Sequence, residues 1–152
     1  MTAPHIRIFP HNQKEFPSRD TLTTWLLTGL KARGGRYLLW NKDAVAELPS
    51  GSLVLFRYGQ VVVGEAVVFE YSRDSSVVDR NLAGDDQKYE ACVWFSPSSI
   101  RVYAPPVDIE ALQSFIGESP NIIPGALPYF KIEDWNVYPR LLAHVGKSGT
   151  FI

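Results

Sequence analysis

The stretch that decides the fold is residues 52–71, "SLVLFRYGQVVVGEAVVFEY". It contains two runs rich in β-branched and aromatic residues, 53–57 and 61–71, separated by Gly59 and Gln60. Such residues fit a pleated surface, and a short connection that contains glycine joins two strands into a hairpin. We therefore expect an antiparallel hairpin here.

Gly64 lies inside the second strand of this hairpin. A glycine in a strand interior marks a bulge, a bend, or the close approach of another group to the backbone. Two explanations remain open. The sheet can curl at Gly64, where a missing Cβ avoids a clash, or a ligand can come close to the backbone there. We favour curvature.

Three further segments have helical patterns. The first begins at Ser18 or Asp20, either of which can cap a helix, and carries apolar residues at helical spacing up to Gly34–Gly35. The second follows Asp108 over residues 109–115. The third covers residues 131–145, and we expect it to bend or restart around Pro139.

Short strand patterns fill most of the rest: 6–9, 36–40, 88–97 and 98–106. Prolines follow the first and end the last of them, residues 72–87 and 117–130 read as loops, and residues 146–152 read as a loose end. Strands in close succession without a repeated β-α-β pattern favour an α+β protein with an antiparallel or mixed sheet. We expect this sheet to curl into a small barrel with flanking helices.

The composition indicates one ordinary globular domain over residues 1–152. No apolar run approaches the roughly 20 residues of a membrane span, and the N-terminus lacks a signal pattern, so we expect a cytoplasmic protein. The single Cys92 excludes an internal disulfide and a multi-cysteine zinc site. Known phosphate-loop, nucleophile-elbow and zinc-protease motifs are absent, and the three histidines are scattered. We therefore expect no cofactor, no metal and no catalytic residue.

The charges are unevenly distributed. Residues 1–60 carry eight Lys and Arg against four Asp and Glu, a net of +4, whereas residues 61–119 carry four against ten, a net of −6. Lys31, Arg33 and Arg36 lie together at the end of the first helix. Cations suit a helix C-terminus through its dipole, and they also suit a phosphate-facing surface, so both explanations remain open.

Several aromatic residues lie at strand ends or in loops. Trp40 ends a strand and precedes Asn41, Trp94 lies near the end of another strand, and Tyr129 belongs to a Pro/Gly-rich loop. Aromatic rings beside an amide suit a pocket in which a planar heterocycle stacks while the amide reads its edge. Cys92 alternates with Trp94, so we expect a buried packing role for its thiol rather than a nucleophilic one.

Four segments together form a pattern that is known from one superfamily: "RYLLW" (36–40), "PSGSLVLFRYGQVVVGEAVV" (49–68), "YEACVWF" (89–95) and "IPGALPYFKIEDWNVYPRLL" (123–142). On these segments the sequence resembles the PUA-like superfamily, which includes the EVE, ASCH, YTH and SRA-type modules. The last segment is similar to the closing part of EVE-type modules. The resemblance covers residues 36–145 and leaves the N-terminal strand and helix (1–35) outside it. Ser52 stands where the family usually has aspartate, which leaves the subfamily open.

The resemblance implies a curled β-barrel with a pocket at one end that binds a modified or flipped base. By position, Trp40, Asn41, Trp94 and Tyr129 form this pocket, and the phosphates fall to Lys31, Arg33, Arg36 and Lys42. Several bacterial relatives are specificity modules of modification-dependent restriction enzymes. We therefore expect a nucleic-acid partner, DNA in preference to RNA, with methylated cytosine as one candidate base and a nuclease domain that could follow residue 152.

Two other functions remain open. Some ASCH-type relatives are small hydrolases that use a lysine, a hydroxyl and a glutamate, and Lys42 and Glu65 are the residues here that could serve. A protein-interaction domain is the other alternative, favoured by the acidic middle of the chain and its net charge of −1.

Overall fold

The computed structural model describes residues 2–39, 47–72, 91–125 and 129–152. Its elements, in chain order, are β1 (Ile6–His11), α1 (Arg19–Trp25), the π-helical η1 (Leu26–Leu30), β2 (Arg36–Leu39), β3 (Leu53–Tyr58), β4 (Val61–Ser72), β5 (Ala91–Phe95), the 3-10 turn η3 (Pro97–Ser99), β6 (Arg101–Asp108), α3 (Ile109–Ile116), β7 (Lys131–Ile132), α4 (Val137–Ser148) and β8 (Thr150–Phe151).

The long strand β4 is the centre of the sheet. Its residues 61–67 pair antiparallel with β3, which confirms the predicted hairpin. On its other side, the first half of β4 pairs with β6 and the last half pairs with β5. The main path of strands is β2-β5-β4-β3-β1-β7, in which β1 and β3 are parallel, so the predicted α+β class with a mixed sheet is confirmed.

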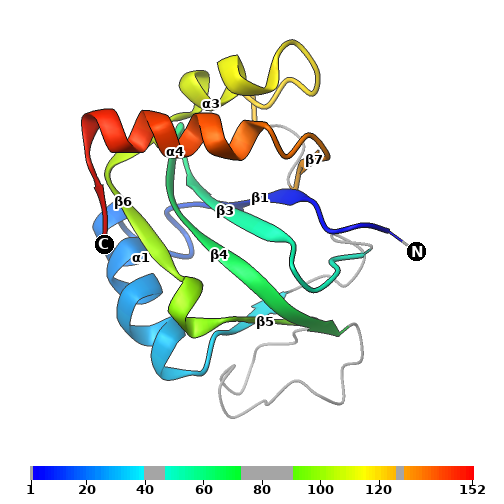
Figure 1. Ribbon diagram of the computed structural model, residues 1–152. Helices are drawn as coiled ribbons and strands as arrows, with labels where there is room; N and C mark the ends of the chain where they lie inside the picture. The colour runs from blue at the N-terminus through cyan, green and yellow to red at the C-terminus, as the bar shows by residue number, and fades with distance from the viewer. Residues whose placement is uncertain (1, 40–46, 73–90, 126–128) are drawn as a thin grey trace.

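The predicted closed barrel is not confirmed. Among the strands that the structure describes, β2 and β7 end the main path and do not pair with each other, so the sheet stays open. It is nevertheless strongly curled, as the sweep of β4 across Figure 1 shows.

Gly64 explains the curl. The β4–β6 register shifts between Val62 and Gly64, and the β3–β4 register shifts between Phe56 and Arg57, the residues opposite. A Cβ built on Gly64 would lie 2.4 Å from the carbonyl oxygen of Arg101 in β6. The group that approaches this glycine is therefore the neighbouring strand. The register shifts agree with the predicted bend at Gly64, and the space beside this glycine is taken by β6.

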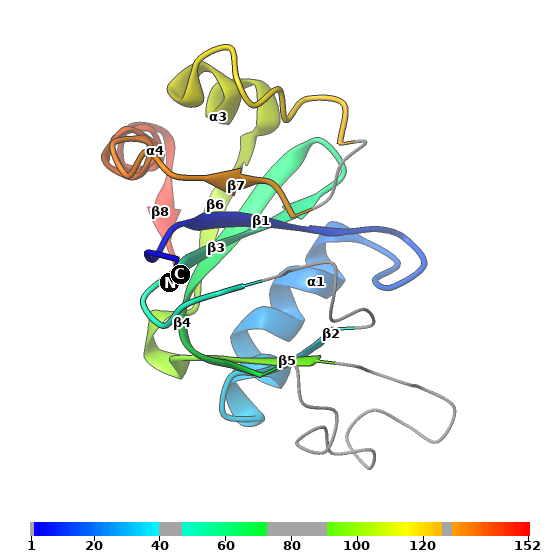
Figure 2. The same ribbon diagram turned by 90° about the vertical axis from the view of Figure 1, so that its right-hand side faces the viewer.

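The two faces of the sheet carry two separate cores. Alternation along β3 sends Val54 and Phe56 to one face and Leu53 and Leu55 to the other. The first core is completed by Leu22, Leu26 and Leu30 of α1 and η1, and the second by Leu112 of α3 and Leu141 and Val145 of α4. Figures 1 and 2 show α3 and α4 together over one side of the sheet and α1 on the other.

The first helix begins and ends as its sequence predicts. The side chain of Ser18 accepts a hydrogen bond from the backbone N–H of Thr21, as a helix cap should. At the other end, Gly35 has φ +81° and its N–H donates to the carbonyl of Leu30 at 2.9 Å. A Cβ on Gly35 would lie 2.0 Å from the carbonyl oxygen of Phe95, so β5 passes too close for any other residue.

The C-terminal part differs from the prediction. Residues 131–132 form β7, which pairs with β1, and the helix begins only at Val137. Pro139 therefore lies in the first turn of α4, where a missing N–H costs no intrahelical bond. Residues 150–151 form β8, which pairs with β6. The segment predicted to be a loose end is thus hydrogen-bonded to the sheet.

Two strands run through prolines that were predicted to end them. Pro10 lies inside β1, where β7 pairs only with Ile6 and Arg7 and so needs no N–H from residue 10. Pro105 and Pro106 lie inside β6, within the stretch where the β4–β6 ladder is interrupted. At all three positions the missing donor breaks no ladder bond.

Candidate functional site

The predicted site residues fall in two places. Lys31, Arg33, Arg36 and Trp94 belong to the region where η1 ends and β2 pairs with β5, which we call the basic ridge. Tyr129 lies elsewhere, before β7. Trp40, Asn41 and Lys42 lie outside the described residues.

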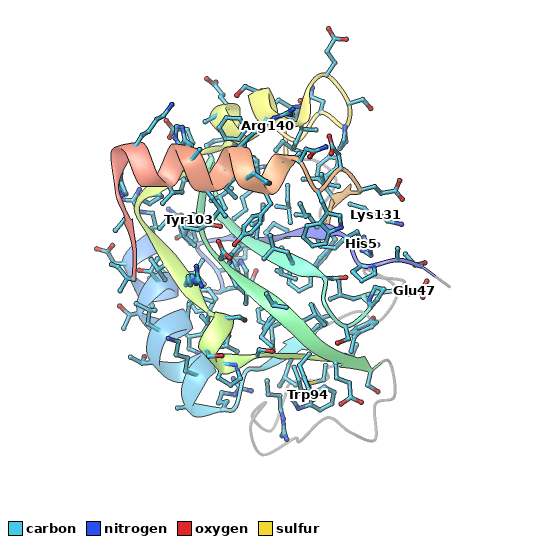
Figure 3. All side chains as sticks on the ribbon, in the orientation of Figure 1. His5, Glu47, Trp94, Tyr103, Lys131 and Arg140 are labelled. Carbon is cyan, nitrogen blue, oxygen red and sulfur yellow. The ribbon has the colours of Figure 1, made fainter. Side chains whose placement is uncertain are left out.

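The basic ridge brings a cation and an indole together. Arg36 and Trp94 are register partners on β2 and β5, and the guanidinium carbon of Arg36 lies 6.0 Å from the centroid of the Trp94 ring. This is the distance of a cation–π contact. Arg33 is half-buried, and its Nε and Nη2 atoms are buried without a hydrogen-bond partner in the part of the chain that the structure describes. Figure 3 shows Trp94 at the end of the sheet remote from α4.

Cys92 is buried beside this ridge. Burial raises the pKa of its thiol to about 11, although the nearby positive charges of Arg36 and Arg33 act in the opposite direction. The thiol is therefore protonated at neutral pH and is a poor nucleophile. The predicted burial of Cys92 is confirmed.

Trp94 and Tyr129 do not share one pocket. Val93 and Phe95 point into the first core, so alternation along β5 turns Trp94 to the opposite face of the sheet. Tyr129 packs against the first core, with its ring edge-to-face on Phe9 at a centroid distance of 5.0 Å. The sheet separates the two residues, and their predicted grouping needs this correction.

Tyr129 has an unusual backbone. Its φ of +61° is left-handed, a conformation that is a genuine outlier for a bulky residue and that collects at functional sites. The Nη1 atom of Arg7 donates to the Tyr129 carbonyl at 2.9 Å and helps to hold it there. Burial raises the pKa of the Tyr129 hydroxyl, and the charges of nearby Glu15 and Tyr71 act in the same direction.

Tyr129 forms one wall of a cleft of about 500 Å³. The other walls come from the end of β1 and the chain after it, which contribute His11 and Glu15, and from the end of β3 and the β3–β4 turn, which contribute Arg57 and Gln60. Clefts of roughly 300–1,000 Å³ are typical of small-molecule sites. The volume is therefore ample for one planar heterocycle.

Arg57 fixes the shape of this cleft. Only 4% of its surface is exposed, its Nε donates to the carbonyl of Gly59 at 2.7 Å, and its Nη1 and Nη2 donate to the carbonyls of Ile122 and Ile123. Burial lowers the pKa of the guanidinium. Among the described residues no carboxylate pairs with it, so its function is to clamp the loop that leads to Tyr129 onto the hairpin turn.

His11 forms the buried floor. Its Nδ1 lies 3.3 Å from the carbonyl of Arg57 and its Nε2 lies 2.7 Å from the hydroxyl of Tyr37. Because the carbonyl can only accept, Nδ1 carries the proton and Nε2 accepts from Tyr37. Complete burial lowers the pKa of His11 to about 4, so the ring is neutral at physiological pH.

Glu65, the candidate glutamate of the hydrolase alternative, faces the second core. It is buried and accepts hydrogen bonds from the hydroxyls of Tyr103 at 2.9 Å and Tyr138 at 2.5 Å. Burial raises the pKa of both tyrosines, and the Glu65 charge acts in the same direction. Figure 3 shows Tyr103 beneath α4. Glu65 thus ties α4 to the sheet and lies on the opposite face from the cleft.

Of the residues that line this cleft, the sequence predicts Tyr129 as a site residue but not His11, Glu15 or Arg57. The sequence contains one signal for Arg57. It is a charged residue at the end of an apolar strand, and a buried guanidinium needs hydrogen-bond acceptors.

Within the described ranges, no group of three His, Cys, Asp or Glu side chains could hold a metal ion, and no helix is long and apolar enough to cross a membrane.

Comparison with known proteins shows the fold alone. No protein-family model matches the chain, and no curated protein does. An ASCH protein from Zymomonas mobilis is similar in structure, with a TM-score of 0.54, 8% identity, and coverage of 91% of this chain and 94% of that one. The YTH domain of a Zygosaccharomyces rouxii protein, solved with N6-methyladenosine RNA, has a TM-score of 0.45, 16% identity, and coverage of 99% and 93%.

The chain therefore has an ASCH-type fold, which supports the PUA-like fold implied by the sequence resemblance. The more particular similarity of residues 123–142 to EVE-type modules stays a prediction.

Proposed function

We propose that this chain is a nucleic-acid-binding module that takes one modified or flipped base into the Tyr129 cleft. The observation that carries the proposal is Tyr129 itself, a half-buried aromatic ring held in a left-handed backbone on the wall of a cleft of about 500 Å³. A ring fixed in this way presents a preorganised stacking surface, and every base has a π-face that can use it.

The free energy that base stacking returns is similar in size to the cost of extruding the base. Extruding a base from a duplex costs a few kcal/mol of stacking and pairing. Stacking on an aromatic side chain returns about 1–3 kcal/mol per base. In this proposal the basic ridge supplies the remainder by holding phosphates farther along the nucleic acid through Lys31, Arg33 and Arg36. Trp94, beside Arg36, stacks a base or sugar of that more distant part on the outer face of the sheet.

A more specific form of this proposal comes from the resemblance alone. In it the nucleic acid is DNA, the base is methylated cytosine, and the chain is the specificity domain of a modification-dependent restriction system. It has no catalytic residue of its own and works with a fused or associated nuclease. By the resemblance, Trp40 and Asn41 also belong to the base-binding residues and Lys42 to the phosphate-binding ones.

Substitution at Tyr129 tests the proposal. We expect Tyr129→Ala to weaken binding to a duplex with one 5-methylcytosine by about 5- to 150-fold, the equivalent of about 1–3 kcal/mol of stacking. Tyr129→Phe keeps the ring and should bind normally. The matched control is Phe69→Ala. Phe69 is also aromatic, 65% of its surface is exposed, and it does not line the cleft.

Fluorescence anisotropy with labelled duplexes, at one fixed salt concentration, measures these affinities. Equal binding by Tyr129→Ala and the native protein would show that the cleft does not hold the base. A native protein that binds none of the methylated, hydroxymethylated or unmodified oligonucleotides would remove the nucleic-acid function altogether.

A further inference from the structure

Glu15 is held at the rim of the cleft by a turn of its own. The side-chain oxygen of Asn12 accepts from the backbone N–H groups of Lys14 at 2.9 Å and Glu15 at 3.3 Å. The backbone carbonyl of Asn12 accepts from Glu15 and Phe16 at 3.2 and 3.0 Å. Such an Asx-type turn fixes the backbone from which the carboxylate projects. Glu15 is therefore placed by the fold, although its side chain is exposed.

The carboxylate of Glu15 has an unused capacity for hydrogen bonds. His11 and Arg57, which line the same cleft, direct their side-chain nitrogens to partners within the protein. No hydrogen bond or ion pair to the Glu15 carboxylate occurs among the residues that the structure describes, and Arg57 does not pair with it. Partial burial raises the pKa of Glu15, so water solvates this carboxylate less well than a free surface carboxylate.

An ionised carboxylate only accepts hydrogen bonds. The edge of a base that turns toward Glu15 must therefore present an N–H donor. Cytosine and adenine carry an exocyclic amine, at N4 and N6 respectively, and a glutamate that accepts from the N4 amine of cytosine is a known way of reading that base. Thymine carries a carbonyl oxygen, O4, in the same place, and two facing acceptors repel each other.

We propose that Glu15 determines which bases the cleft accepts, by accepting a hydrogen bond from the exocyclic amine of a base stacked on Tyr129. This inference rests on the proposed function. It adds that the cleft selects amino-bearing bases and rejects their oxo counterparts, so that 5-methylcytosine binds and thymine, its deamination product, does not.

The sharpest test uses those two bases, because they share the ring and the methyl group. Two labelled oligonucleotides carry either 5-methylcytosine or thymine at one unpaired central position, and their affinities are measured by anisotropy at the same salt concentration. The native protein should prefer 5-methylcytosine by about 5- to 150-fold, since a good base-edge contact is worth about 1–3 kcal/mol of discrimination.

Glu15→Gln should abolish this preference, because the amide can turn either its donor or its acceptor toward the base. The matched control is Glu110→Gln, on the exposed surface of α3, which should leave the preference unchanged. Because the Glu15 side chain is exposed, we expect both variants to fold, and equal thermal melting temperatures verify it.

The outcomes separate the two proposals. A preference that survives in Glu15→Gln, or a native protein that binds both oligonucleotides equally, overturns the role of Glu15 while base binding at Tyr129 stands. A native protein that binds neither oligonucleotide overturns both.

Discussion

Lowering the pH from 7 to 5 should destabilise the fold through His11. The ordinary pKa of histidine is 6.5, whereas burial lowers the pKa of His11 to about 4 in the folded protein. Between these two values the unfolded chain binds a proton on His11 and the folded chain does not. Stability from this group is thus complete above pH 6.5 and is lost as the pH falls toward 4.

The size of the effect follows from the two pKa values. At pH 5 the unfolded imidazole is almost fully protonated and the folded one is almost fully neutral, so the loss relative to pH 7 is about 2 kcal/mol. His5 has a lowered pKa as well, mainly through burial, and its contribution has the same sign. Since urea slopes are about 1–3 kcal/mol per molar for small proteins, the unfolding midpoint should fall by about 1 M.

Urea unfolding of the native protein and of His11→Gln, at pH 7 and pH 5, isolates the effect. The glutamine amide retains a donor and an acceptor but does not titrate, so the variant should lose about 2 kcal/mol less than the native protein over this range. Identical losses in the native protein and in His11→Gln would refute the argument that the buried ring is neutral.

Three other substitutions test the structure. Gly64→Ala places a methyl group against the backbone oxygen of Arg101, which cannot swing away, and should cost about 3 kcal/mol of unfolding free energy in urea; a loss below about 1 kcal/mol would mean that the strands separate easily here. Arg57→Lys cannot reach three carbonyls at once and should cost about 2 kcal/mol and weaken base binding, whereas unchanged binding would show that the clamp does not position Tyr129. Tyr138→Phe removes a donor from the buried Glu65 carboxylate and should cost about 1.5–3 kcal/mol with base binding unaltered, and lost binding would instead connect Glu65 to the cleft.

The local parts of the fold could be predicted from the sequence. The 52–71 hairpin, the Ser18 cap and the Gly34–Gly35 stop each depend on neighbouring residues, so short patterns suffice. The parallel pairing of β1 with β3 and the two-residue strands β7 and β8 depend on distant partners. A strand of two residues is too short to show an alternating pattern in the sequence. It can be recognised only from the hydrogen bonds to its partner strand.

The candidate site, like the fold, has features that local sequence patterns predict and features that depend on the folded arrangement. The sequence predicts Tyr129 as a site residue because it is an aromatic residue in a Pro/Gly-rich loop, Trp94 because it lies near a strand end, and Arg36 because it belongs to a cluster of cations. Their separation by the sheet could not be seen, because it depends on which face each strand presents. Glu15 and His11 are single polar residues near a strand end, and such residues are common in any sequence.

The arrangement of β4, which borders β3, β5 and β6, has a consequence for how the molecule moves. Both cores are built on this one ribbon, so neither can melt or slide while the other stays intact, and we expect unfolding in a single all-or-none step. The scaffold contains no hinge between halves among its described elements. A ligand in the cleft therefore meets a frame in which the two cores respond together as one unit.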